Sequence, residues 1–142
     1  MLYAYKVRKE GDLYFADMKE IPSLSQKGYK TEEELDDGIA HAFTDALEYD
    51  FRRKGLAIPA PEVPVREEDN AIVVTALTQA RILLWNYMVK EDLTASWVCR
   101  RANANRQEVQ RILDFNQNVS IEKVEKLISA LGFAFSISMF KL

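Results

Sequence analysis

The sequence has few of the residues that build disulfides, metal cages or membrane spans. Its 142 residues include one cysteine, Cys99, which excludes an internal disulfide and a multi-cysteine metal cage. No run approaches the roughly 18 consecutive apolar residues of a membrane-spanning helix. Lys6 and Arg8 interrupt the apolar N-terminus too early for a secretory signal. We therefore expect a cytoplasmic protein with no membrane partner.

A recognisable set of catalytic residues is also missing. A metal-dependent nuclease needs clustered carboxylates, but Asp12 lies in a predicted turn, and Asp17 and Glu20 follow a predicted strand. We expect these three side chains to be solvated. The single histidine, His41, lies off the apolar face of its helix, where a surface position is expected. With no Gly-rich phosphate loop and no nucleophile elbow, we predict no catalytic residue, no metal and no cofactor, and hence no enzyme.

The charges of the chain are divided unevenly along its length. The net charge is −3, but residues 1–78 carry 10 Lys and Arg against 16 Asp and Glu, whereas residues 79–142 carry 9 against 6. An acidic half suits a basic partner, and a basic half suits a phosphate backbone. We predict two domains, 1–78 and 79–142, with different partners, although an uneven division of this size also arises by chance.

The first thirty residues have the pattern of a β-hairpin. Apolar runs at residues 2–9 and 13–18 flank the turn Gly11-Asp12. Residues 23–27 are expected to form a short third strand after the break at Pro22.

A long helix is predicted to begin at Thr31 and to end at Gly55. Thr31 and Glu34 have the spacing of a capping box, in which each side chain accepts a hydrogen bond from a free backbone N–H near the helix start. Gly55 is suited to the turn that ends a helix. Apolar residues recur at steps of three and four, which predicts one buried face. These residues are Leu35, Ile39, Phe43, Ala46 and Leu47.

Three of the four prolines lie in residues 56–70, and Glu67 and Glu68 follow them. This composition predicts an extended connector on the surface, since prolines break helices. Residues 71–77 are apolar and rich in β-branched side chains, so we expect a further strand there. The order strand–strand–strand–helix–strand describes a small α+β domain.

The C-terminal half has a helical period. We predict one helix from residue 79, a second over 94–102, a third over 106–114 and a fourth that Ser120 caps. Residues 133–139 alternate between large apolar and small side chains, which predicts a terminal strand. A lone strand has unpaired edges, so this strand is a candidate for pairing with its copy in a second subunit.

Residues 95–112 carry the sharpest functional signal. A helix-turn-helix needs small or apolar residues where its helices cross, a short turn, and a second helix with an exposed polar face. The crossing positions hold Val98, Cys99, Ala104, Val109 and Ile112. The exposed positions hold Asn105, Arg106, Gln107, Gln110 and Arg111.

These exposed side chains are suited to DNA, and we predict that all five contact it. Arg forms two hydrogen bonds to guanine, Asn and Gln form two to adenine, and all of them reach phosphates. In such a motif the second helix enters the major groove with its N-terminal residues near the base edges. A plain helical hairpin with a polar outer face has the same pattern, so both interpretations stay open at this stage.

The segment resembles the helix-turn-helix of the phage-repressor class. Cys99 occupies the crossing position where that class usually has Ala, and Asn103 occupies the turn position where it usually has Gly. Cys is small enough for the crossing, and Asn accepts the left-handed conformation of the turn.

The whole chain resembles the HicB antitoxins. Gln26-Lys27-Gly28, with Thr31 and Glu34 at the following helix start, resembles the HicB N-terminal domain, and the connector Ala57-Ile58-Pro59-Ala60-Pro61 follows in the same order. Three downstream runs resemble HicB members that end in a helix-turn-helix. They are Leu84-Trp85-Asn86-Tyr87-Met88, residues 106–114 and Ala130-Leu131-Gly132.

The resemblance implies an α+β fold: a partial ribonuclease H-like β-β-β-α-β domain that has lost catalysis, then an all-α helix-turn-helix domain with a terminal strand. It implies that the N-terminal domain binds a small basic HicA-like toxin that cleaves mRNA, and covers its active site. It also implies that the C-terminal domain binds operator DNA of its own operon as a homodimer or tetramer. The acidic charge of residues 1–78 agrees with such a partner.

Two other functions remain open from the sequence. One is a one-component transcriptional regulator whose N-terminal domain senses a small ligand, and a weaker one is a catalytic nuclease. A short, basic reading frame beside the gene would favour the antitoxin over the sensor.

Overall fold

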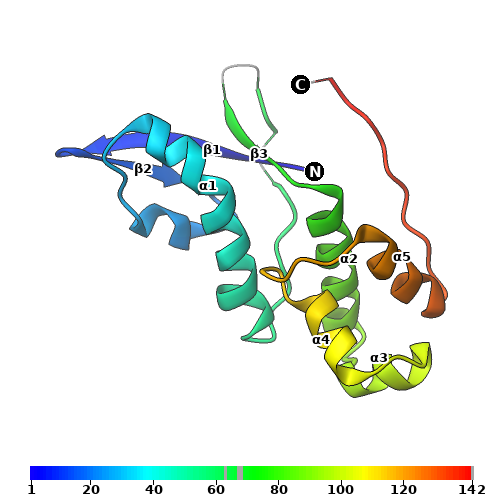
Figure 1. The fold of residues 1–142 in the computed structure, drawn as a ribbon. Helices are drawn as coiled ribbons and strands as arrows, with labels where there is room; N and C mark the ends of the chain where they lie inside the picture. The colour runs from blue at the N-terminus through cyan, green and yellow to red at the C-terminus, as the bar shows by residue number, and fades with distance from the viewer. Residues whose placement is uncertain (63, 67–68, 142) are drawn as a thin grey trace. The chain divides into compact units, whose positions relative to one another are not determined.

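The computed structural model describes residues 1–62, 64–66 and 69–141. The chain divides into two compact units, Met1–Val74 and Thr75–Leu142, called here the N-terminal and C-terminal units. Figure 1 shows the elements of each unit. In the described part of the chain, no helix is both long and apolar enough to cross a membrane.

The N-terminal unit is built on an antiparallel sheet with the strand order β2-β1-β3. β1 (Leu2–Glu10) lies in the centre, between β2 (Leu13–Asp17) and β3 (Asn70–Val73). The register pairs Arg8 with Phe15 and Tyr3 with Ile72. The predicted hairpin is confirmed, and Gly11 makes its turn with a positive φ of 61°.

The predicted strand at residues 23–27 is wrong, because Pro22–Gln26 forms a short 3-10 helix, η1. Pro22 sits at the start of η1, where its fixed φ suits a helix and its missing N–H costs nothing. The Ser25 hydroxyl donates to the Pro22 carbonyl oxygen at 2.8 Å, which closes the turn locally. Leu24 is thereby turned inward and buried.

The long helix is confirmed as α1 (Glu32–Ala46) continued by a π-helical segment, η2 (Leu47–Arg52). The Thr31 hydroxyl oxygen accepts from the Glu34 N–H at 3.0 Å, and Gly55 ends the segment with φ 69°. All five residues predicted on the apolar face are buried. Figure 1 shows α1 over β1 and β2, where the rings of Tyr3 and Phe43 lie 5.0 Å apart.

One of the three carboxylates expected in solvent is buried. Glu20 is 6% exposed, and its Oε1 accepts from the Glu62 backbone N–H at 2.8 Å. The burial of Glu20 could not be predicted from its place in the sequence, because its hydrogen-bond partner lies 42 residues away. Asp12 is exposed as expected, and Asp17 is half-buried with Oδ2 3.0 Å from Arg8 Nε. His41 is confirmed as a surface side chain.

The connector after Gly55 is anchored rather than freely exposed. Ile58 is buried, and the Tyr3 hydroxyl donates to the Pro59 carbonyl oxygen at 2.7 Å. Residues 63, 67 and 68 of the predicted connector lie outside the described residues. The strand predicted at 71–77 is shorter, because the Thr75 hydroxyl accepts from the Thr78 N–H at 3.2 Å and caps the next helix.

The C-terminal unit packs the four predicted helices around one apolar core (Figure 1). They are α2 (Ala76–Lys90), α3 (Ala95–Ala102), α4 (Arg106–Leu113) and α5 (Ile121–Ala130). α2 begins three residues earlier than predicted because of the Thr75 cap. Every helix contributes to the core, which includes Leu84, Met88, Val98, Val109, Ile112, Val124 and Leu127.

The predicted terminal strand is wrong for the isolated chain. The described residues after Gly132 are extended but belong to no sheet, as the trace that follows α5 shows in Figure 1. A strand needs a neighbour for its backbone groups. The backbone contact at the start of this segment, Phe133 N to Ile128 O at 3.2 Å, only closes the end of α5.

Candidate nucleic-acid interface

The turn between α3 and α4 has the geometry that the sequence predicts. Asn103 adopts the left-handed conformation, with φ 51° and ψ 46°. The Ala104 N–H donates to the Cys99 carbonyl oxygen at 3.0 Å and thereby satisfies one of the last carbonyls of α3. The chain then needs only three residues, 103–105, to enter α4.

The start of α4 is fixed by Asn105. Its Oδ1 accepts from the Glu108 backbone N–H at 2.7 Å, which confirms Asn105 as the N-cap. Because the amide oxygen is used in the cap, the amide NH₂ group of Asn105 is the part left to face a ligand. The cap fixes both the first turn of α4 and the direction in which the following side chains project.

One flank of α4 is apolar and locks the helix in place. Val109, Ile112 and Leu113 are buried in the core of the C-terminal unit, together with Val98 of α3. Cys99 and Ala104 are only half-buried, at the edge of this crossing. The predicted crossing therefore forms, but Val98 rather than Cys99 lies at its centre.

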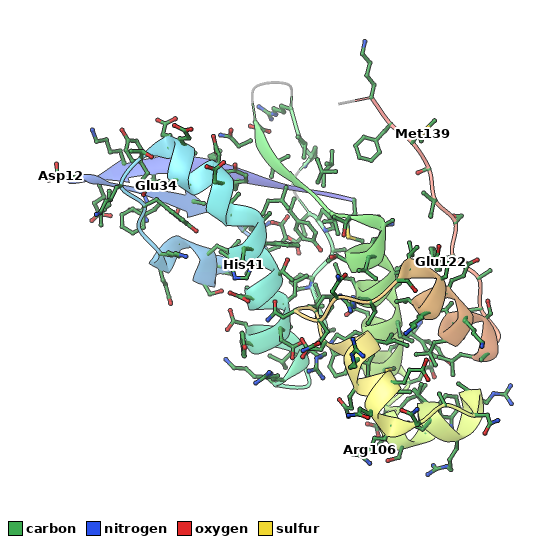
Figure 2. The ribbon with its side chains drawn as sticks, in the orientation of Figure 1. Asp12, Glu34, His41, Arg106, Glu122 and Met139 are labelled. Atoms are coloured by element: carbon green, nitrogen blue, oxygen red, sulfur yellow. The ribbon has the colours of Figure 1, made fainter. Side chains whose placement is uncertain are left out.

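The other flank of α4 brings together the five residues predicted to contact DNA. Asn105, Arg106, Gln107 and Arg111 are exposed, and Gln110 is half-buried. Arg106 projects at the start of the helix, as its label in Figure 2 shows, and its Nη1 donates to the Ser96 hydroxyl at 3.1 Å. Four of the five side chains thus lie along one short helix, and Asn105 lies at its N-cap.

A groove of about 430 Å³ runs along this flank. α4 lines it with polar groups that include Gln107 and Arg111, and α5 contributes Lys123. The positive charges of Arg111 and Lys123 thus border one concave surface, with Glu108 as the negative charge on it. Lys123 is absent from the predicted set. The Ser120 cap places it at the third position of α5, but only the packing of α5 shows that it lines this groove.

A second residue that sequence reasoning missed is Arg81 of α2. It is 2% exposed and donates to backbone carbonyl oxygens at the end of α4 and in the turn that follows. The available signal was one charged residue on an otherwise apolar stretch of helix, between Ala80 and Ile82. Arg81 is a positioning residue, since it touches α4 but lies away from the exposed flank.

The N-terminal unit offers a different kind of surface. The first turns of α1 present five exposed carboxylates, on Glu32, Glu33, Glu34, Asp36 and Asp37. Figure 2 shows this end of α1 around Glu34. Among the described residues, no group of three His, Cys, Asp or Glu side chains is arranged to hold a metal ion.

Taken together, the features define a two-unit α+β protein with an acidic sheet unit and a basic helical unit. No protein-family model matches the chain, but curated relatives cover most of it. The Antitoxin HicB of Pseudomonas fluorescens is 32% identical over 130 residues, which are 92% of this chain and 88% of that protein. The Antitoxin HicB of Escherichia coli is 26% identical over 126 residues, 89% of each chain. The Antitoxin HicB 1 of Photorhabdus laumondii is 29% identical over 126 residues, 89% of this chain and 78% of that protein. The chain belongs to the HicB antitoxin family, which confirms the resemblance found in the sequence.

Proposed function

We propose that this protein neutralises a HicA-type mRNA-cleaving toxin with its N-terminal unit and represses its own operon by binding operator DNA with its C-terminal unit. The observation that carries the DNA-binding part is the two-sided environment of α4. Its apolar flank is held in the core, whereas its polar flank, from Asn105 to Arg111, is exposed.

In this proposal α3, the turn at Asn103 and α4 act as a helix-turn-helix, with α4 in the major groove. Arg106 and Gln107, in the first turn of α4, contact base edges, Arg pairing with guanine and Gln with adenine. Gln110 lies one turn further along and extends the same contact. The NH₂ group of Asn105 and the guanidinium of Arg111 bind phosphates and fix the register of the helix on the duplex.

The groove beside α4 supports the phosphate contacts. Arg111 and Lys123 border it from two different helices, so a phosphate between them would be neutralised from both sides. Such contacts supply affinity for any DNA sequence, and the base contacts add the preference for the operator.

Toxin binding is assigned to the N-terminal unit because of its charge and the family of the chain. Its residues carry six more acidic than basic side chains, and the exposed carboxylates of α1 form a surface for a basic partner. Its sheet and helix are compatible with a partial ribonuclease H-like fold, although η1 takes the place of one strand.

The carboxylates near the sheet have structural roles, since Asp17 binds Arg8 and Glu20 binds the Glu62 N–H. We therefore infer that this unit binds the RNA-cleaving toxin and is not itself an enzyme.

We also infer that the protein acts as a homodimer or tetramer. Two copies of α4, related by a two-fold axis, would contact two half-sites about one helical turn apart, roughly 34–36 Å. This arrangement predicts a palindromic operator.

The DNA-binding part is tested with the full-length protein and its own promoter region in a mobility-shift assay. We expect Gln107→Ala to lose preference for the promoter while circular dichroism shows an unchanged fold. Lys54→Ala, an exposed substitution in the N-terminal unit, is the matched control and should bind normally. Unchanged affinity of Gln107→Ala would count against the role of α4.

The toxin-binding part is tested by co-expression with the product of the neighbouring gene, followed by mass measurement of the purified complex. A stable complex with a short, basic protein is expected. If no such gene or complex exists, and the N-terminal unit binds a small metabolite instead, the protein is a one-component regulator and the antitoxin proposal fails.

A further inference from the structure

The side chain of Arg106 on α4 is bonded to a residue of the preceding helix, α3. Its Nη1 donates to the hydroxyl oxygen of Ser96 at 3.1 Å, so the contact joins the starts of the two helices. Figure 2 shows Arg106 at the start of α4. Arg106 is exposed, whereas Ser96 is half-buried. A long exposed side chain ordinarily has many rotamers, and a hydrogen bond of this kind restricts them.

Both ends of this hydrogen bond are held in place by the fold. The Thr94 side chain caps α3 two residues before Ser96, and Val98, two residues after it, is fully buried in the core. On α4, the Asn105 cap directly precedes Arg106. Groups carried by such rigid elements can fix the direction of a flexible side chain. The Ser96 oxygen is therefore a fixed point toward which the guanidinium is turned.

The chemistry of the partner keeps the guanidinium available to a ligand. A hydroxyl oxygen accepts one N–H and leaves the positive charge of Arg106 in place, whereas a carboxylate would neutralise that charge and compete with DNA for it. The bond to Ser96 uses Nη1, so Nε and Nη2 can meet a ligand. Their two parallel N–H groups match the O6 and N7 acceptors of guanine.

The two exposed arginines of α4 differ in their surroundings. Arg106 is bonded to Ser96 of α3, whereas Arg111 borders the groove that Lys123 of α5 also lines. A phosphate contact depends mainly on charge and tolerates several directions of approach, but a two-bond contact with a base edge requires one direction. The arginine that is held in one direction is thus the one suited to a base.

We propose that Ser96 is a positioning residue for DNA recognition. Its hydroxyl directs the guanidinium of Arg106 so that the Nε–Nη2 edge meets a guanine in the major groove, and it thereby strengthens the preference of α4 for guanine. Because the bond orders this long side chain in the free protein, less conformational entropy is lost when DNA binds. The inference rests on the proposed function, since it takes α4 as the helix that enters the groove.

The first experiment measures base preference by incubating the full-length protein with a library of randomised duplexes and sequencing the bound fraction. We expect Arg106→Ala to lose the preference for guanine at one position. Ser96→Ala should reduce the preference at that same position about two- to tenfold, which is the cost of ordering one long side chain on binding. Ser96→Thr keeps a hydroxyl and should restore the native preference. Ser129→Ala, which removes an exposed serine hydroxyl from α5, is the matched control and should select the native sequences.

A double-mutant cycle then shows whether Ser96 acts through Arg106. In an Arg106→Ala background, Ser96→Ala should cause no further change, because the arginine that the hydroxyl directs is gone. A native guanine preference in Ser96→Ala, or the same loss of preference in both backgrounds, would overturn the proposal. A loss of affinity that is equal for all sequences would mean that Ser96 contacts a phosphate, and this result would overturn it too.

The second experiment observes the free full-length protein, without DNA, through NMR relaxation of the arginine Nε–H groups. The order parameter of the Arg106 side chain reports its motion on the picosecond to nanosecond timescale. We expect it to fall in Ser96→Ala and to stay at the native value in Ser96→Thr. The order parameter of the Arg111 side chain is the internal control and should be the same in all three proteins. Equal values for Arg106 in the native protein and in Ser96→Ala would refute the positioning role.

The two experiments separate this inference from the proposed function. If the native protein selects guanine through Arg106 and Ser96→Ala selects it equally well, only the role of Ser96 is wrong. If the native protein binds no duplex although Ser96 orders the Arg106 side chain, the role of α4 in DNA binding is wrong, and the positioning of Arg106 for DNA fails with it.

Discussion

The guanidinium of Arg81 on α2 donates from Nε to the carbonyl oxygen of Ile112, at the end of α4, over 2.7 Å. Its Nη2 donates to the Gln117 carbonyl oxygen at 2.6 Å and to that of Arg111 at 3.3 Å. The last carbonyls of a helix lack partners within it and carry partial negative charge, so a buried cation is favourable there. Arg81 thus fixes the C-terminal end of α4, while Asn105 fixes its start.

Replacement of this arginine should destabilise the C-terminal unit. We expect Arg81→Met to lower the free energy of unfolding by about 2–4 kcal/mol, because buried carbonyl oxygens lose their charged donor. Urea denaturation followed by circular dichroism measures the change. Lys90→Met, an exposed position on the same helix, should change it by less than about 0.5 kcal/mol. Equal effects of the two substitutions would contradict the structural role of Arg81.

Substitutions of Arg111 and Gln107 should differ in their effect on the salt dependence of DNA binding. Arg111→Ala should flatten the plot of log affinity against log salt by roughly one, because one phosphate contact is lost. Gln107→Ala should keep that slope and reduce discrimination between operator and unrelated DNA by about 1–3 kcal/mol. Fluorescence anisotropy at several salt concentrations measures both quantities. Identical salt slopes for Arg111→Ala and the native protein would exclude the phosphate contact.

Asn103 should tolerate glycine but not a β-branched residue. Its φ of 51° lies in the left-handed region, which costs most L-residues about 1–2 kcal/mol. We expect Asn103→Val to lower the free energy of unfolding by about that amount, and Asn103→Gly to leave it equal or slightly higher. Thermal and urea denaturation provide the values. A more stable Asn103→Val variant would show that the turn adopts another conformation.

The N-terminal unit should lose stability at alkaline pH. Burial, with the nearby charge of Glu20, raises the pKa of Tyr3 to about 12. Burial, with the charge of Asp36 and a hydrogen bond to it, raises the pKa of Tyr5 to about 12. In the unfolded chain both titrate near pH 10. Because the folded state favours the neutral phenols, their stabilising contribution is complete below pH 10 and is lost as the pH rises from 10 to 12.

The test is the free energy of unfolding as a function of pH for the native protein and for the double variant Tyr3→Phe/Tyr5→Phe. The variant should start lower, because it lacks the bonds to Pro59 and Asp36, but should decline less between pH 10 and 12. Parallel curves would mean that the two phenols do not cause the loss.

The sequence predicted those elements whose signals are local. The Thr31–Glu34 pair, the apolar face of α1, the Asn105 cap and the left-handed Asn103 all follow from residues within one or two helical turns of each other. The predicted DNA-contacting residues fell on one exposed flank for the same reason, since helical spacing decides which side chains share a side. Their contact with DNA remains a prediction.

Two segments predicted as strands from the pattern of their side chains do not form strands. Residues 23–27 have side chains that suit a strand, but Pro22 and the Ser25 hydroxyl close a helical turn. Residues 133–139 have the alternation of a strand, yet no neighbour completes it within the described part of the chain. In the first case local contacts close a helical turn, and in the second case the backbone lacks a neighbouring strand.

By itself, the sequence determined the helix caps at Thr31, Asn105 and Ser120 and the polar and apolar flanks of α4, because periodicity and capping act over a few residues. The order of its motifs also carried the resemblance to the HicB family. Only the tertiary structure decided that Glu20 is buried against the Glu62 N–H, that Lys123 borders the groove of α4, and that Arg81 holds the end of that helix. These contacts join residues 30 or more positions apart, or on separate helices, for which the linear pattern carries no distance information.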